Sequence, residues 1–259
     1  MSPIRFRQAL VRRPSSSVVD GLRAVAGPDP DVDRFRAEHD GYCDALGAAG
    51  VAVEMLDELP AHPDGVFVED AALCVGTHAV VLRPGAPSRR AEADAIAPAL
   101  AARFATVARV ERGYVDGGDV LVTADEVLVG LSSRTDSVGA AALRDALAPT
   151  GVPVRVVETP AGVLHFKTDC AVIDDRTVFA TARLATSGCF DGYEVLVCPS
   201  GEEAAANLIR VNDVIIMRSR FPATKETLVA AGYDVVTIDA DEAARVDGGL
   251  SCMSLRCNW

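Results

Sequence analysis

The stretch that decides the fold is Asp247-Gly248-Gly249-Leu250-Ser251-Cys252-Met253-Ser254-Leu255-Arg256, near the end of the chain. It is the last of five short apolar segments, which follow one another at intervals of about 42 to 49 residues. Each segment carries one polar side chain, in the order Asp70, Asp116, His165, Asn207 and Cys252. A period of this length is typical of repeat architectures, in which each repeat is one supersecondary unit. The spacing therefore predicts five units that deliver these side chains to a common centre.

Between these segments the chain repeats one order of elements: a β-branched strand, an arginine-containing turn, an amphipathic helix and a second strand. The three clearest copies are residues 78–111, 126–158 and 213–239. A weaker copy begins at Ile4, with its helix at 32–49 and its second strand at 51–56, and a degenerate copy begins near Thr177, with its later strand at 194–197. One unit cannot bury its apolar face alone. We therefore expect an α/β propeller of five units, closed by the final segment.

Composition and charge limit the class of protein. The 259 residues are 49% hydrophobic and 24% charged, as in a globular protein, and no linker-like stretch divides them, so residues 1–259 are predicted to form a single domain. The net charge of −12 argues against nucleic acid or an anionic membrane as partner and favours a small cationic ligand. No apolar run reaches the roughly 18 to 20 residues that cross a bilayer. Residues 4–13 begin with alternating apolar and arginine residues, which favours a first strand over a transit peptide.

Cysteine and histidine usage bears on compartment and metal binding. The seven cysteines are an odd number without paired spacing, which predicts reduced thiols in a cytoplasmic protein. Three of the four histidines lack ligand-like neighbours, so no metal site is predicted. The oligomeric state is left open, and a homodimer is one of the alternatives.

Two of the five polar positions carry groups suited to covalent catalysis. Cys252 follows the small residues Gly248 and Gly249, where a substrate can approach the backbone closely, and a thiol is an effective nucleophile. His165 is a natural acid and base near neutral pH. Taken singly, a cysteine or histidine in an apolar segment is more often a structural core residue. The shared register of these two residues favours a catalytic pair.

Charged residues in the other units point to a charged substrate. Asp116 precedes two glycines that allow a tight turn or a close ligand contact, and Glu69-Asp70 is an acidic pair in an apolar strand. A turn carboxylate or a solvated strand end explains these acids as readily as a guanidinium site does. Arg89 and Arg134 occupy equivalent turns of two units, which suggests two forks aimed at one carboxylate.

At these residues the chain resembles the dimethylarginine dimethylaminohydrolases, which belong to the guanidino-group-modifying pentein superfamily. The motifs, in order, are Phe67-Val68-Glu69-Asp70, Val115-Asp116-Gly117-Gly118-Asp119, Leu164-His165-Phe166-Lys167-Thr168 and Ser251-Cys252-Met253-Ser254-Leu255-Arg256. The resemblance covers essentially the whole chain and implies an α/β fold, the five-bladed pentein propeller with pseudo-fivefold repeats. Arginine deiminases share the chemistry but are considerably longer chains, so length favours the hydrolase.

The resemblance implies hydrolysis of an Nω-methylated arginine to citrulline and a methylamine through a covalent thiouronium, with no metal or organic cofactor. In that scheme Cys252 is the nucleophile, His165 the acid and base, and Asp116 the residue that orients His165. The implied substrate contacts are Asp70 and Glu69 at the guanidinium, Asp64 and the backbone of Leu22 at the α-amino group, Arg89 and Arg134 at the α-carboxylate, Asp247 at the guanidinium end and Phe67 along the aliphatic stem. Two alternatives stay open: a sister enzyme for arginine or another guanidino compound, and a non-catalytic pentein that only binds.

Overall fold

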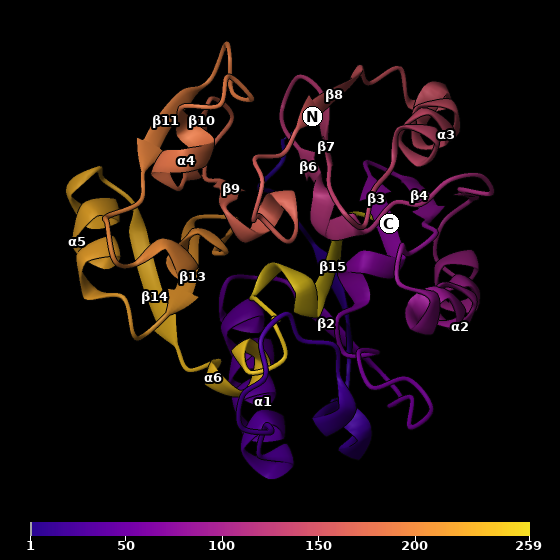
Figure 1. Cartoon of the computed structure of the whole chain (residues 1–259), viewed down its shortest axis with the longest axis horizontal. Helices are drawn as coiled ribbons and strands as arrows, with labels where there is room; N and C mark the ends of the chain where they lie inside the picture. The colour runs from indigo at the N-terminus through magenta and orange to yellow at the C-terminus, as the bar shows by residue number, and fades with distance from the viewer. Residues whose placement is uncertain (1) are drawn as a thin grey trace.

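The computed structural model describes residues 2–259 and contains five three-stranded sheets arranged in a ring (Figure 1). In strand order the sheets are β15 (Ser254–Cys257), β1 (Gln8–Arg12) and β2 (Ala52–Leu56); β3 (Ala72–Val75), β4 (His78–Val81) and β5 (Thr106–Arg109); β6 (Val120–Val122), β7 (Val127–Leu131) and β8 (Val154–Glu158); β9 (Cys170–Val172), β10 (Thr177–Ala180) and β11 (Glu194–Val197); and β12 (Ile209–Val211), β13 (Val214–Arg218) and β14 (Asp234–Ile238). In every sheet the middle strand pairs antiparallel with the inner strand and parallel with the outer one. The predicted five-unit pentein propeller is confirmed.

The two ends of the chain close the ring within one sheet. The last strand, β15, pairs antiparallel with β1 and places Leu255 opposite Leu10, while β1 pairs parallel with β2. The first unit is therefore complete only when the C-terminal strand is in place, as the position of the final segment predicted.

The first strand begins later than predicted, at Gln8 rather than at Ile4. The Ile4 carbonyl accepts a hydrogen bond from the Asn212 N–H at 2.7 Å, and the Phe6 N–H donates to Asn212 Oδ1 at 2.9 Å. Asn212 turns the chain between β12 and β13 with a φ of 54°. These bonds take residues 4–6 out of the first sheet and attach them to the fifth unit, so their alternating pattern reflects extended backbone outside the sheet.

Helices lie on the outside of the ring, and the core lies between neighbouring units (Figure 1). The longer helices are α1 (Val32–Ala48), α2 (Arg90–Ala101), α3 (Ser137–Leu147) and α5 (Pro222–Ala230), and the single-turn ones are α4 (Ala182–Ala185) and α6 (Asp241–Ala244). The short α4 belongs to the unit predicted to be degenerate. Buried apolar side chains form five clusters, each drawn from adjacent units, so every unit needs its neighbours. Over residues 2–259, no helix has the length and apolar character to span a membrane.

Each inner strand follows a single turn of 3₁₀ helix, and these turns carry the predicted polar residues or directly adjoin them. They are η2 (Val68–Ala71), η4 (Gly117–Asp119), η6 (Phe166–Thr168), η7 (Glu203–Ala206) and η8 (Ser251–Met253). The acidic pair Glu69-Asp70 was predicted to lie in a strand, but it lies in turn η2, and β3 begins only at Ala72, because the turns crowd together where the units meet on the axis. A Cβ atom on Gly117, for example, would lie 1.9 Å from the Glu69 carbonyl oxygen. Tight turns let five backbones approach one point, and the strands then run away from it.

Candidate active site

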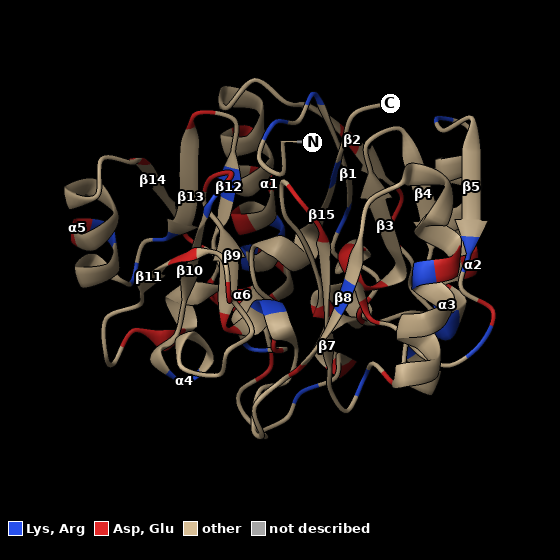
Figure 2. Cartoon of the chain, turned by 90° about the horizontal axis from the view of Figure 1, so that it is seen from above, with Lys and Arg blue, Asp and Glu red and all other residues tan. Residues whose placement is uncertain are grey.

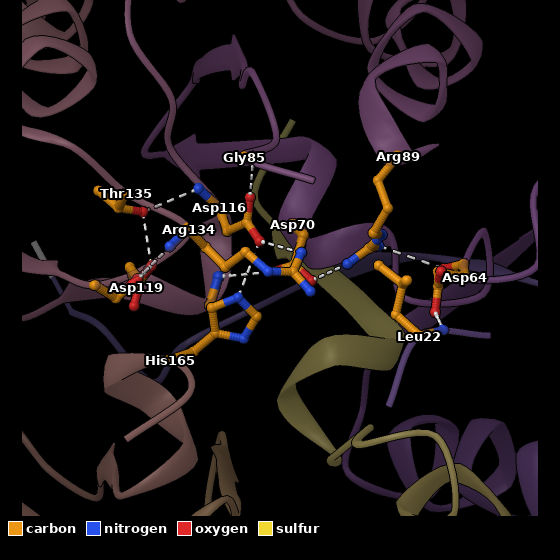
Figure 3. Close-up of polar contacts among 12 residues, drawn as sticks. Leu22, Asp64, Asp70, Gly85, Arg89, Asp116, Asp119, Arg134, Thr135 and His165 are labelled. Atoms are coloured by element: carbon orange, nitrogen blue, oxygen red, sulfur yellow. Dashed lines mark hydrogen bonds and ion pairs between the residues drawn. The ribbon is translucent and has the colours of Figure 1, made fainter. Parts of the chain in front are cut away.

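His165 and Asp116 form the central polar contact of the site (Figure 3). His165 Nε2 lies 2.9 Å from Asp116 Oδ2. The other carboxylate oxygen, Oδ1, accepts a hydrogen bond of 2.7 Å from the Gly85 N–H, and the Asp116 N–H donates to Thr135 Oγ1 at 3.1 Å. Because Asp116 is fully buried and held from both sides, its carboxylate fixes the plane of the imidazole.

Asp70 lies beside the same imidazole, on turn η2. Its Oδ1 accepts a hydrogen bond of 2.8 Å from the Gly118 N–H, and its Oδ2 is paired with Arg89. A Cβ atom on Gly118 would lie 2.9 Å from His165 Cγ and 3.0 Å from Asp70 Oδ1. The second glycine after Asp116 is therefore required so that Asp70 and His165 can share this space.

The electrostatics of the site keep His165 protonated at neutral pH. Burial disfavours the charged ring, but the carboxylates of Asp70, Asp119 and Asp116 outweigh burial and raise the pKa of His165 to about 9. Burial likewise opposes ionisation of Asp70, yet Arg89 and His165 hold the pKa of its carboxyl well below the usual range. The pair is therefore an imidazolium beside a carboxylate, which can donate a proton to a bound group.

Cys252 lies on turn η8 and is 9% exposed. Its Sγ accepts a hydrogen bond of 3.4 Å from the Gly249 N–H. Burial, followed by the negative charges of Glu69 and Asp70, raises the pKa of the Cys252 thiol to about 12. The resting group is a neutral thiol, and a cation bound nearby would offset the carboxylates and favour the thiolate.

A pocket of about 30 Å³ lies between these groups. Its walls include predicted residues from several units: Leu22, Asp64, Phe67, Asp70, Arg89, Arg134, His165, Asp247 and Cys252. The predicted orienting residue Asp116 is not among the described residues that line the pocket, and it reaches the site through its contact with His165 Nε2. The sequence-predicted set is thus largely brought together around one small cavity.

One side of the pocket is closed by the loop that follows η1 (Ser16–Asp20). The Leu22 N–H donates to Asp64 Oδ1 at 3.0 Å, and the Ala24 N–H donates to Asp247 Oδ2 at 2.5 Å. Burial raises the pKa of Asp64 above its ordinary value. Asp64 and Asp247 therefore hold the loop by its backbone, and Leu22 presents its side chain at the pocket.

The two predicted arginine forks have different surroundings. Arg89 is buried, and its guanidinium donates to three groups. Nη1 donates to Asp70, and Nη2 donates to Glu92 at 2.8 Å and to the Phe67 carbonyl at 2.9 Å. Nε also donates to Glu92, at 3.0 Å. Arg134 places Nη1 3.4 Å from Asp116 Oδ2 and keeps 19% of its side chain exposed. Sequence reasoning missed Glu92, although its position three residues after Arg89 at the start of α2 is a spacing that pairs charges.

Glu69 is the predicted substrate contact that the structure places elsewhere. Its Oε1 lies 2.5 Å from Lys167 Nζ and 3.3 Å from Arg256 Nη2. Among the described residues that line the pocket beside Cys252, Glu69 is not found. Adjacent residues on turn η2 therefore point to opposite sides, with Asp70 toward the pocket and Glu69 away from it.

Asn207 connects the turn of the histidine to the turn of the cysteine. Its Nδ2 donates to the Lys167 carbonyl at 2.8 Å and to Ser251 Oγ at 3.1 Å, and its Oδ1 accepts from the Ser251 N–H at 3.1 Å. The repeat period already marked Asn207 as the fourth polar residue, but no site role was predicted for it. An amide suits this position because it both donates and accepts.

The acid–base group also has the composition of a cation site. Ligand atoms of Asp70, Asp116 and His165 all lie within 4.8 Å of one another. Each residue is already engaged, Asp70 by Arg89 and the Gly118 N–H, and Asp116 by His165 and the Gly85 N–H. The arrangement fits proton transfer with the groups in these bonds.

A closed ring of five such units, with a buried cysteine, a histidine and carboxylates at its axis, defines the guanidino-group-modifying penteins. The sequence model of the eukaryotic N,N-dimethylarginine dimethylhydrolases matches residues 29–183. The N(G),N(G)-dimethylarginine dimethylaminohydrolase of Pseudomonas aeruginosa is 35% identical over 253 residues, covering 97% of this chain and 99% of that protein. The Streptomyces coelicolor enzyme of the same name is 35% identical over 261 residues, covering 96% of both. The chain belongs to the dimethylarginine dimethylaminohydrolase family.

Solved structures agree with this assignment. The Pseudomonas aeruginosa enzyme, as a cysteine-to-serine mutant complexed with citrulline, superposes with a TM-score of 0.94 at 34% identity and covers 98% of this chain and 100% of that one. A histidine-to-glycine dimethylarginine dimethylaminohydrolase in an adduct with S-methyl-L-thiocitrulline gives 0.93 at 35% identity, with 97% and 99% covered. The N-terminal domain of the arginine dihydrolase ArgZ, at 19% identity and a TM-score of 0.84, shares the fold.

Proposed function

We propose that this protein hydrolyses Nω-methylated arginine to citrulline and mono- or dimethylamine through a covalent thiouronium on Cys252. The observation that carries the proposal is the meeting of a thiol, an imidazolium and a carboxylate around one pocket. Relatives that align over nearly the whole chain carry this activity in their names, and one was solved with citrulline.

In the proposed complex the pocket binds both ends of the substrate. Asp70 pairs with the guanidinium beside Cys252, since its carboxylate is the ionised group that faces the pocket. Asp64 and the backbone near Leu22 bind the α-amino group. Arg134, which is partly exposed, binds the α-carboxylate of the substrate. The buried Arg89 adds positive charge at the same carboxylate while it stays paired with Asp70. The ring of Phe67 and the carboxylate of Asp247 line the remaining wall.

The first half of the reaction forms the covalent intermediate. The bound guanidinium offsets the carboxylates around Cys252 and lowers the thiol pKa, so the thiol releases its proton to solvent as the substrate binds. The thiolate then attacks the guanidinium carbon. The His165 imidazolium donates its proton to the methylated nitrogen, so the C–N bond breaks and the amine leaves as a neutral molecule. Asp116 keeps the ring oriented and stabilises its charge before the transfer.

The second half of the reaction releases citrulline. The neutral imidazole accepts a proton from water as the hydroxide attacks the thiouronium carbon, which leaves His165 protonated for the next cycle. The S–C bond then breaks, and the proton of the new hydroxyl group passes to the departing Cys252 sulfur, so citrulline and the neutral thiol are formed. The proton that leaves with the amine and the proton taken from water both pass through the His165 ring, whose pKa is raised to about 9, so its resting form is ready to act as the acid.

We further propose that residues 1–259 act as one catalytic unit in the cytoplasm. The seven cysteines, all free in the structure, support a reducing compartment. A homodimer is compatible with this unit and is tested by sedimentation of the purified protein.

The test is a colorimetric citrulline assay with asymmetric dimethylarginine, monomethylarginine and arginine side by side. Citrulline from the methylated compounds and not from arginine is the expected result, and Cys252→Ser should abolish it without altering the melting temperature. Citrulline from arginine alone would make the protein a deiminase. No citrulline from any compound would favour a pentein that only binds.

A further inference from the structure

A second cavity, of about 120 Å³, lies on the axis of the ring. Residues of all five inner strands, β3, β6, β9, β12 and β15, line it. Each of these strands is the edge strand of its sheet, so one side of its backbone has no partner within that sheet. Buried backbone N–H and C=O groups need a hydrogen-bond partner, and a cavity of this size has room for several water molecules. The axial cavity therefore has both the room and the polar backbone groups to hold water.

The axial cavity and the substrate pocket share one wall, made by the catalytic turns. Glu69, Gly117, Lys167 and Ser251 line the axial side. Their sequence neighbours Asp70, His165 and Cys252 line the pocket side. The inner strands run from this wall to a far mouth lined by Ser2, Pro3 and Asn258, on the side of the ring where both chain ends lie (Figure 2).

The wall contains one carboxylate oxygen that still needs a donor. Glu69 is 5% exposed, and its Oε1 is held by Lys167 and Arg256. Its Oε2 is buried and has no hydrogen-bond partner among the described residues. Leaving a buried acceptor unpaired costs about 1–3 kcal/mol, more for a charged group, so a donor from the cavity is expected there. Water or a small ammonium ion supplies such a donor.

The proposed reaction needs a second route to the reacting carbon. When the amine departs, the rest of the substrate stays bonded to Cys252 and fills the small pocket, under the loop held by Asp64 and Asp247. The amine must leave and a water must enter while that intermediate blocks the way by which the substrate came. The axial cavity is the space immediately behind the same turns.

We propose that the axial cavity is the exit route for the methylamine and the entry route for the hydrolytic water, with Glu69 Oε2 as the first group that receives the amine. The inference rests on the proposed function. An aliphatic amine becomes an ammonium ion at neutral pH, and its N–H groups match the free oxygen of Glu69. The positive charges of Lys167 and Arg256 beside Glu69 limit how tightly the cation is held, so it passes on toward the far mouth.

The kinetic test uses substitutions that narrow the axial cavity at positions distant from the catalytic turns. Val122 and Val172 lie at the far ends of β6 and β9, line the cavity and are only half-buried. In Val122→Phe and Val172→Phe, kcat for dimethylarginine should fall roughly tenfold, because release of dimethylamine becomes rate-limiting. The fall in kcat for monomethylarginine should be smaller, because monomethylamine is the smaller product. Alkylation of Cys252 by a reactive amidine, which frees no amine, should be unchanged. Val154→Phe, a half-buried β8 position outside the cavity, is the matched control.

Unchanged kcat in either cavity variant with a wild-type melting temperature would overturn the proposal. A second measurement tests the proposal even if the cavity variants fail to fold. The Cys252→Ser protein is saturated with citrulline, dimethylammonium chloride is added, and NMR saturation transfer from the protein to the dimethylammonium ion is measured. Transfer is expected, and Glu69→Gln should abolish it, whereas Glu58→Gln, a surface carboxylate paired with Arg36, should not. Absence of transfer would refute the amine site. If the wild-type protein forms no citrulline, the proposed function fails. Saturation transfer to dimethylammonium in the absence of citrulline then still tests whether the cavity binds an amine.

Discussion

Replacing Asp116 by asparagine should move the proton affinity of His165 while keeping the ring in place. The rise of the His165 pKa from 6.5 to about 9 corresponds to about 3 kcal/mol in favour of the imidazolium. Asp116 is one of three carboxylates responsible, and it touches the ring at 2.9 Å. An opposite charge at such range shifts a pKa by roughly 1–3 pH units. In Asp116→Asn we therefore expect the His165 pKa to fall by that amount.

The amide preserves the geometry of the contact. An asparagine oxygen can still accept from the Gly85 N–H or from the imidazole, so loss of charge is the main change. Two measurements follow the shift: the basic limb of the pH profile of kcat/KM for citrulline formation, and a ¹⁵N NMR titration of His165 in the Cys252→Ser background. Both should move to lower pH by the same amount.

The control is Asp94→Asn, which removes an exposed carboxylate that does not line the pocket. A basic limb and an NMR midpoint that stay near pH 9 in folded Asp116→Asn protein would refute the electrostatic reasoning.

The free energy of unfolding of the wild-type protein should also depend on the protonation of His165. Because the folded pKa of His165 is raised, its contribution is fully present below about pH 6.5 and is lost as the pH rises through about 9.

Two further predictions concern the neighbours of His165. Gly118→Ala should abolish citrulline formation, because the new methyl group would meet His165 Cγ at 2.9 Å and displace the ring; a folded, fully active variant would contradict this. The Cys252 thiol, with its pKa raised to about 12, should react with iodoacetamide at a rate that still rises between pH 9 and 11 in the free protein. A plateau below pH 9, with Cys252→Ser as the blank, would show that the thiol is less perturbed than its burial implies.

The sequence alone determined the number of units and the register of their polar residues. The period of about 42 to 49 residues predicted five repeats closed by the last segment, and the pairing of β15 with β1 confirms it. This works because each unit must bury its apolar face on the next, so strand and helix patterns are written locally in every repeat. The same register predicted that His165 and Cys252 share one site, and both line the same pocket.

Local patterns could not separate neighbours with the same chemistry. Glu69 and Asp70 are adjacent acids, yet a single 3₁₀ turn sends Asp70 to the substrate pocket and Glu69 to the axial cavity. Arg89 and Arg134 hold equivalent turns, but only Arg89 has Glu92 three residues later to bury its charge. A strand pattern of four residues also cannot distinguish a turn from the start of a strand.

The tertiary structure decided the chemistry of the site, because its contacts join distant parts of the chain. Asp116 and His165 are separated by 49 residues, and Glu69 and Arg256 by 187. The pKa of His165 depends on carboxylates from two other turns and on how deeply all of them are buried. Residue types can be read from the sequence, whereas burial and charge separation exist only once the five turns have met on the axis.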